Sequence, residues 1–168
     1  MNAADAYPER LANWEREVLD LNALGYDVTE LDLRDYWDAD SHKLPAVLSA
    51  ADLIWAVGGN AFVLARAAER ARLGHALTRA PGMIFAGYSA GACLTSRDLR
   101  GIELMDDPGE LPTGYSADTP PTTLDLTGTR VLPHAGSPDA GRAERQLEQE
   151  HLSYLRLRDG DDALFGDW

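Results

Sequence analysis

The chain has 168 residues and a formal net charge of −13, and 45% of its residues are apolar. This composition excludes a disordered chain, and the length suits one domain with a single core, which we expect to cover residues 1–168. The negative charge disfavours binding to nucleic-acid phosphates and to anionic membranes. No apolar run approaches the roughly 20 residues of a membrane helix, so we expect neither nucleic acid nor membrane as a partner.

The beginning of the chain and its cysteine content predict a cytoplasmic protein. Residues 1–6 lack the basic and apolar regions of a secretory signal. Cys93 is the single cysteine, so the chain forms no internal disulfide. A reducing compartment fits both observations.

The first third of the chain predicts a helix, a strand and a short helix. Apolar residues recur at helical spacing after Pro8, a plausible first helical residue, until Gly25 caps the end. Alternating and β-branched residues over 26–33 predict a strand. A short helix is expected around residues 44–50.

The next segment predicts two buried strands, each followed by a helix. Residues 53–57 are apolar throughout, which is typical of a strand covered on both faces, and an alanine-rich helix is expected over 61–73. A helical turn at 75–79 then leads to a second apolar run, 83–86, which ends at a serine turn.

The last third predicts an irregular region followed by a strand, a helix and a strand. Turn residues dominate between the serine helix and residue 129 and suggest the rim of an active site. Strands are expected over 129–133 and 154–157, with a helix over 140–152 between them. Alternating strands and helices predict an α/β fold of three layers, in which a mainly parallel sheet is flanked by helices.

A serine with glycine two residues before and after it marks the candidate nucleophile. Gly87 and Gly91 flank Ser89 at the point where an apolar strand meets a helix. Glycine permits the strained turn of a nucleophile elbow, and the following helix offers N–H groups to a developing oxyanion. The alternative is an ordinary strand-to-helix turn. A base and an acid elsewhere in the sequence are needed to distinguish the two interpretations.

His134 is the best candidate for the base, because it directly follows an apolar strand and so falls at the edge that carries Ser89. A partly buried loop histidine is an equal alternative on sequence alone. The other three histidines have polar surroundings and suit the surface: His42, His75 and His151.

We expect the acid of a triad between Ser89 and His134, which gives the chain order serine, acid, histidine. Glu103 is favoured, because Ile102 and Leu104 flank it as in a short extended segment. Asp106 and Asp107 are alternatives, although they can serve simply as turn formers next to Pro108.

The glycine pair at residues 58 and 59 follows the first buried strand and offers a second oxyanion donor. It is equally typical of a strand-to-helix turn in which Asn60 caps the helix. Cys93 lies about one helical turn beyond Ser89 and suits the core better than catalysis. No metal-ligand spacing and no phosphate-binding loop are found, so we expect neither metal nor cofactor.

Three ordered motifs together resemble the family of dipeptidase E (alpha-aspartyl dipeptidase) and cyanophycinase, serine peptidases with a fold like class I glutamine amidotransferases. The motifs are residues 57–62, residues 87–92 and the pair Pro133 and His134. The resemblance implies Ser89 as nucleophile, His134 as base, and the N–H groups of Gly59 and Ala90 as oxyanion donors. Glu103 falls near the family's acid.

The resemblance also implies sites for a small peptide substrate. Asn60 and Arg142 are assigned to substrate binding, with Arg145 as an alternative to Arg142, although solvated helix charges explain both arginines as well. Relatives open with a strand before the segment that matches 3–8 and continue past 166–168. We therefore expect a sheet without its first strand and C-terminal strands, and the exposed edges make a homodimer plausible.

The sequence thus predicts a serine-type peptidase that hydrolyses small peptides through a serine, histidine and acid triad and an acyl-enzyme. One alternative is an inactive remnant or binding subunit of the same fold. The other is an α/β-hydrolase esterase, which normally needs more strand and helix units than the 45 residues from Ser89 to His134 allow.

Overall fold

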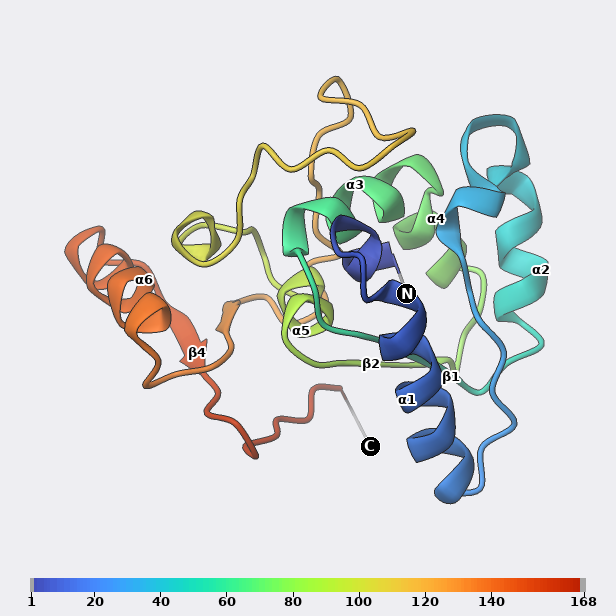
Figure 1. Ribbon diagram of the computed structural model, residues 1–168, viewed down its shortest axis with the longest axis horizontal. Helices are drawn as coiled ribbons and strands as arrows, with labels where there is room; N and C mark the ends of the chain where they lie inside the picture. Colours follow the sequence, from blue (N-terminus) through green and yellow to red (C-terminus); the bar gives the residue numbers. More distant parts are fainter. Residues whose placement is uncertain (1, 167–168) are drawn as a thin grey trace.

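The computed structural model describes residues 2–166 and combines short helices with parallel strands (Figure 1). The α-helices and strands, in chain order, are α1 (Arg10–Ala23), α2 (Leu44–Leu48), β1 (Leu53–Ala56), α3 (Ala61–Arg70), α4 (Leu73–Leu77), β2 (Ile84–Gly87), α5 (Ala90–Leu94), β3 (Arg130–Leu132), α6 (Pro138–Gln149) and β4 (Tyr154–Arg156). Four 3-10 turns complete them: η1 (Asn2–Ala6), η2 (Leu33–Tyr36), η3 (Asp38–Lys43) and η4 (Ile102–Leu104). In the described chain, none of the helices has the length and apolar character needed to cross a membrane.

Strand pairing in residues 2–166 is parallel throughout. β1 pairs with β2, with Leu53 opposite Ile84, and β3 pairs with β4, with Arg130 opposite Tyr154. The predicted α/β class with parallel strands is confirmed. The four strands form two separate pairs in place of one continuous ladder.

The strand predicted over residues 26–33 is wrong. Residues 26–32 run between α1 and η2 without a place in either ladder, and η2 begins at Leu33. Residues 26–31 and β1 both line an open groove of about 790 Å³. The alternating pattern is present, but a strand also needs hydrogen bonds to a neighbouring strand, and residues 26–32 form none in either ladder.

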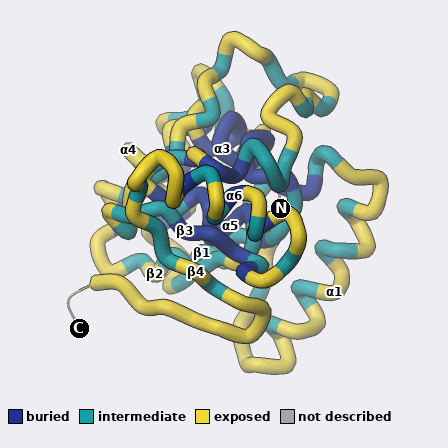
Figure 2. Tube along the Cα trace, turned by 90° about the vertical axis from the view of Figure 1, so that its left-hand side faces the viewer, coloured by how far each residue is buried: buried dark blue, intermediate teal, exposed yellow. Residues whose placement is uncertain are grey.

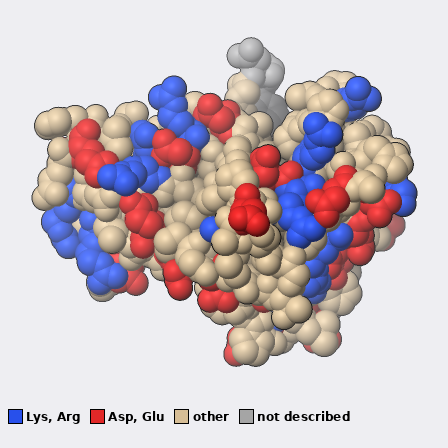
Figure 3. Space-filling view, turned by 90° about the horizontal axis from the view of Figure 1, so that it is seen from above, with Lys and Arg blue, Asp and Glu red and all other residues tan. Residues whose placement is uncertain are grey.

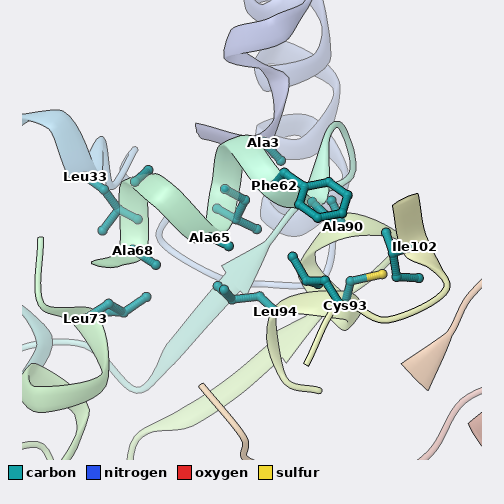
Figure 4. Packing of buried hydrophobic residues seen from close by; sticks show 14 of the residues in the cluster. Ala3, Leu33, Phe62, Ala65, Ala68, Leu73, Ala90, Cys93, Leu94 and Ile102 are labelled. Atoms are coloured by element: carbon teal, nitrogen blue, oxygen red, sulfur yellow. The ribbon is translucent and has the colours of Figure 1, made fainter. Parts of the chain in front are cut away.

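The core is built around α3, in which eight of the ten residues are buried (Figure 2). Its alanines, among them Ala65 and Ala68, let neighbouring elements approach closely, and the helix packs against α5 and η1. Figure 4 shows larger side chains filling the remaining space, with Phe62 above Ala90 and with Leu94 beside Cys93.

The first helix lies on the outside of the molecule. No residue of α1 is fully buried, and Leu19 is 70% exposed. Glu17 attaches the helix to the strands, because its carboxylate accepts hydrogen bonds from Trp55 Nε1 at 2.9 Å and from Tyr88 OH at 2.6 Å. The predicted helix is confirmed, and it begins at Arg10, two residues after Pro8.

The irregular region after η4 is held along α3 by successive side chains of that helix and its cap. Asn60 Nδ2 donates to the Asp107 carbonyl at 3.0 Å, and Arg66 Nη2 donates to the Pro108 carbonyl at 2.9 Å. Arg70 Nη1 donates to a carbonyl further along the loop, that of Gly114, at 2.9 Å. Although the loop has little regular structure, these hydrogen bonds therefore fix its course along α3.

Candidate active site

Ser89 occupies a strained turn between β2 and α5. Its backbone has φ 51° and ψ −119°, a combination that residues with a side chain rarely adopt. Such strain persists only where the surrounding structure enforces it. The parallel ladder before the turn and the buried helix after it provide that enforcement, so the hydroxyl is fixed above the strand ends.

The two glycines around Ser89 are required by close backbone contacts. A Cβ atom on Gly91 would lie 2.0 Å from the Ala56 carbonyl oxygen, and one on Gly87 would lie 2.7 Å from the Gly91 carbonyl carbon. Both separations are far shorter than any van der Waals contact. The glycines predicted from the sequence therefore allow α5 to start directly against the end of β1.

His134 contacts both Ser89 and an acid. Its Nε2 atom lies 3.0 Å from Ser89 Oγ, and its Nδ1 atom lies 2.7 Å from Asp159 Oδ1. With the proton on Nδ1, the imidazole donates to the carboxylate and accepts from the serine hydroxyl, as a general base must. The backbone of His134 has φ 55°, in the left-handed region that residues other than glycine rarely adopt.

Asp159 stands where Glu103 was expected, so the predicted acid is corrected. Glu103 lies on η4 and accepts a hydrogen bond from Gln146 Nε2 of α6 at 2.8 Å. It also lies 3.6 Å from Arg100, and it makes no contact with His134. The flanking apolar residues that suggested an extended segment belong to a 3-10 turn that packs against α6.

The signal for Asp159 was present in the sequence. Asp159 follows β4, as His134 follows β3, and the two strands are parallel neighbours. Carboxyl ends of neighbouring parallel strands meet at one edge, so both side chains arrive at the same place. The expected chain order of serine, acid and histidine places the acid between Ser89 and His134, and Asp159 lies outside that interval.

The two alternative acids have different positions. Asp107 is an exposed turn former whose Oδ1 accepts from the Gly109 N–H at 2.8 Å. Asp106 lines the same pocket as Ser89 and His134, and its Oδ2 accepts from the Ala61 N–H at 2.7 Å. Burial raises the pKa of Asp106, an effect partly offset by that N–H and by His134.

The glycine turn after β1 lies directly against the serine. A Cβ atom on Gly58 would come within 3.2 Å of Ser89 Cβ and 3.6 Å of Ser89 Oγ. Within the described chain the N–H groups of Gly59 and Ala90 have no hydrogen-bond partner. Both are therefore free to donate to a ligand, and their role as oxyanion donors stays a prediction.

A pocket of about 280 Å³ opens beside Ser89 and His134. It is lined by Ser89, Ala90, Cys93, Ile102, Met105, Asp106, Pro133, His134, Ser137, Asp139 and Asp159. This volume lies just below the typical range of small-molecule sites. The arrangement of a strained serine, a histidine and a carboxylate around a small pocket suits nucleophilic hydrolysis.

Comparison with known proteins identifies the family. The family model described as peptidase family S51 matches residues 6–161. The chain belongs to peptidase family S51. The family resemblance noted in the sequence is thereby confirmed.

The fold of this S51 chain matches a solved structure from Listeria monocytogenes EGD-e that is described as a candidate peptidase E protein. The two are 25% identical with a TM-score of 0.62, over 81% of this chain and 63% of the other. The S51 chain thus spans less than two thirds of the length of that protein. None of the curated proteins matches it.

Two side chains assigned to substrate binding lie outside the pocket lining of this S51 protein. Asn60 caps α3, where its Oδ1 accepts from the N–H groups of Phe62 and Val63. Arg142 pairs with Asp139 at 2.9 Å and donates to the Leu104 carbonyl. Both side chains are occupied by contacts within the fold, so the structure does not bring them to the substrate pocket.

Cys93 is a core residue of the S51 domain. It is 2% exposed, and burial raises the pKa of its thiol. A protonated, enclosed thiol is a poor nucleophile, so Ser89 remains the better candidate nucleophile in the pocket. Among residues 2–166, no cluster of His, Cys, Asp or Glu is arranged to hold a metal ion.

Proposed function

We propose that this S51 protein is a serine-type peptidase that hydrolyses small peptides through an acyl-enzyme. The observation that carries the proposal is the continuous chain of contacts from Ser89 Oγ through the His134 ring to Asp159. A serine alone is a weak nucleophile, and this geometry provides both the base and the group that fixes its tautomer. The family membership and the strained serine turn support the same chemistry.

In the first step the Ser89 oxygen attacks the carbonyl carbon of the scissile peptide bond. His134 Nε2 accepts the hydroxyl proton, and the positive charge that forms on the ring is stabilised by Asp159. The carbonyl oxygen becomes an oxyanion, and we expect the free N–H groups of Gly59 and Ala90 to donate hydrogen bonds to it.

Collapse of this intermediate breaks the C–N bond. The imidazolium returns its proton to the leaving amine, and an ester between Ser89 and the acyl part of the substrate remains. A water molecule then attacks the ester carbon with His134 again acting as base. The products are the carboxylic acid and the free serine hydroxyl, so no oxidant, metal or cofactor enters the balance.

The pocket favours a small substrate. Its volume of about 280 Å³ lies just below the range of about 300–1,000 Å³ that is typical of small-molecule sites. Ile102, Met105 and Asp106 line it from η4 and the residues that follow, and Pro133 and His134 line it from the turn after β3. We infer that short peptides fit better than folded proteins.

Labelling by an aryl phosphonate tests the assignment directly. We expect the wild-type chain to be labelled at Ser89, and the Ser89→Ala variant to lose both labelling and peptide hydrolysis. A Ser116→Ala variant serves as the matched control, because Ser116 lies on the loop outside the pocket lining.

The same experiment separates the alternatives. Undiminished hydrolysis by Ser89→Ala would contradict the assignment of the nucleophile. A folded wild-type chain that is neither labelled nor active would favour an inactive remnant of the fold. Turnover of aryl esters without turnover of any short peptide would favour an esterase.

A further inference from the structure

Glu17 of α1 is bound by two aromatic side chains beside the nucleophile turn (residues 87–91). Acidic and basic side chains are interspersed over the face shown in Figure 3. The partners of Glu17 are different, because Tyr88 OH donates to Oε1 at 2.6 Å and Trp55 Nε1 donates to Oε2 at 2.9 Å. Its ion pair with the mostly exposed Arg16 is longer, at 3.7 Å, and its own side chain is only 13% exposed. Glu17 is therefore a shielded acceptor for two neutral donors.

These two hydrogen bonds are the polar link between α1 and the strands that carry the site. Other side chains on this face of the helix line the open groove beside β1, namely Trp14, Val18 and Leu21. The start of α1 is attached elsewhere, since Arg10 pairs with Asp5 of η1. In the described part of the chain, no other hydrogen bond joins α1 to β1, to β2 or to the nucleophile turn.

Tyr88 directly precedes the candidate nucleophile, and its backbone is fixed on both sides. Its N–H donates to the Ala56 carbonyl at 3.1 Å, and its carbonyl accepts from the Gly91 N–H at 2.9 Å. The hydrogen bond to Glu17 adds a third anchor at the far end of the side chain. Since Ser89 has a strained φ of 51°, the turn depends on such anchors to keep its shape.

The ring of Tyr88 also lies against the glycine turn (residues 58 and 59) that carries an expected oxyanion donor. A Cβ atom on Gly58 would come within 3.0 Å of Tyr88 Cε2. On its other side the ring meets that of Trp55, with 5.9 Å between the two centroids. The N–H of Gly59 follows directly after this contact and is free. The Tyr88 ring thus fills the space between α1 and the glycine turn.

We propose that Glu17 is a positioning residue of the active site, which acts through the Tyr88 ring to set the distance between the Gly59 N–H and Ser89. This inference rests on the proposed peptidase function and on the expected oxyanion role of Gly59. A donor stabilises the transition state only at about 2.7–3.1 Å from the oxyanion. Binding of the substrate before reaction depends less on that distance, so the contribution of Glu17 belongs to kcat and not to KM.

Two single variants break the link at its two ends. Tyr88→Phe keeps the ring and removes the hydroxyl, and Glu17→Ala removes the carboxylate while retaining a good helix former. We expect kcat for a short peptide to fall roughly 5- to 50-fold in each, with KM unchanged within about twofold, because small displacements of reacting groups are costly. Glu17→Gln should recover part of the rate, since its amide can still form a hydrogen bond with the phenol.

The double variant tests whether the two residues act as one unit. We expect Glu17→Ala combined with Tyr88→Phe to be no slower than the slower single variant, because both changes remove the same hydrogen bond. Glu15→Ala is the matched control. Glu15 is an exposed residue of the same helix, two positions earlier, and its removal should leave kcat at the wild-type value.

Urea denaturation and labelling of Ser89 distinguish positioning from a structural role. Tyr88 and Trp55 are each 37% exposed, so water can replace the lost partner, and the midpoint of unfolding should stay close to that of the wild type. A diphenyl phosphonate places an oxygen where the oxyanion forms. The rate at which it labels Ser89 should therefore fall in parallel with kcat.

The outcomes separate this inference from the proposed function. Wild-type kcat in Glu17→Ala or in Tyr88→Phe would overturn the inference, and so would losses that add in the double variant. A raised KM with unchanged kcat, or a loss of kcat matched by earlier unfolding in urea, would also overturn it. In each of these cases the wild type still hydrolyses peptides and is labelled at Ser89. If the folded wild type does neither, the proposed function itself fails, and the inference with it.

Discussion

His134 Nδ1 lies 2.7 Å from Asp159 Oδ1, and the side chain of Asp159 is 83% exposed to solvent. In the proposed triad, the acid that orients the base therefore stands in water, on the turn that follows β4. Solvent screens the interaction between the two groups, so the carboxylate contributes through orientation of the ring more than through a strong field. The Asp159 carboxylate should consequently matter less here than a buried acid does in other triads.

Replacement of Asp159 by asparagine tests this expectation. We expect kcat to fall roughly 10- to 100-fold, less than the roughly 10⁴-fold loss known for a buried triad aspartate. Glu103→Gln is the control, because Glu103 contacts Gln146 and not His134. Equal losses in the two variants, or a loss in Glu103→Gln alone, would contradict the assignment of Asp159.

The positions of Ser89 and His134 could be predicted because each follows an apolar strand and carries its signal locally. The glycines around Ser89 indicate a close backbone contact, because any other side chain would clash there. Asp159 could not be singled out in this way, since an aspartate on an exposed turn resembles every other aspartate on a turn. Its role depends on the pairing of β3 with β4, which is a non-local property.

The helices and most strands were predictable for the same reason, because helical spacing and apolar runs are local. The failure at residues 26–33 has a non-local cause. Alternation specifies which side chains face inward, but a strand forms only if a second backbone edge is present to pair with. In the described chain β1 pairs only with β2, and residues 26–31 lie across an open groove from it, so no ladder forms between them.

The contact between Gly91 and Ala56 predicts a sharp difference between two glycine substitutions. Gly91→Ala would place a Cβ atom 2.0 Å from the Ala56 carbonyl oxygen, so we expect a loss of at least about 3 kcal/mol in the free energy of unfolding, together with loss of activity. Gly74→Ala is the matched substitution, since its Cβ would meet Leu124 at an ordinary 3.6 Å inside α4. It should stabilise the protein by about 0.5–1 kcal/mol. Urea denaturation measures both, and equal effects would contradict the contact.

Arg66 is a buried cation whose removal should cost little. Its side chain donates through Nη2 to the Pro108 carbonyl, while Nε and Nη1 are buried without hydrogen-bond partners. Burial lowers the pKa of the guanidinium, which shows that the charged form is disfavoured. We expect Arg66→Met to change the free energy of unfolding by less than about 1 kcal/mol or to stabilise the protein, because an apolar side chain removes the buried charge.

Arg70→Met provides the contrast four residues further along α3. Arg70 pairs with Asp38 at 2.6 Å, and its guanidinium lies 3.9 Å from the centre of the Trp37 ring. Loss of these contacts should destabilise the protein by about 1 kcal/mol or more. Greater destabilisation by Arg66→Met than by Arg70→Met would mean that the charge of Arg66 is compensated in the folded protein.

Cys93 makes the stability of the protein sensitive to alkaline pH. Burial raises the pKa of its thiol above the ordinary value of 9.0, so the unfolded chain releases this proton at a lower pH than the folded protein does. The contribution of the neutral thiol to the free energy of unfolding is fully present below about pH 9. It is lost as the pH rises further, by up to about 1.4 kcal/mol per pH unit.

Urea denaturation between pH 7 and 10.5 should therefore show a steeper decline in the free energy of unfolding for the wild type than for Cys93→Ala. Tyrosines with raised pKa values, such as Tyr115, also lower the stability of the protein as the pH rises. Because both proteins contain these tyrosines, the difference between wild type and Cys93→Ala reports the thiol. Parallel declines, or rapid reaction of the native thiol with a disulfide reagent at pH 8, would contradict the burial of Cys93.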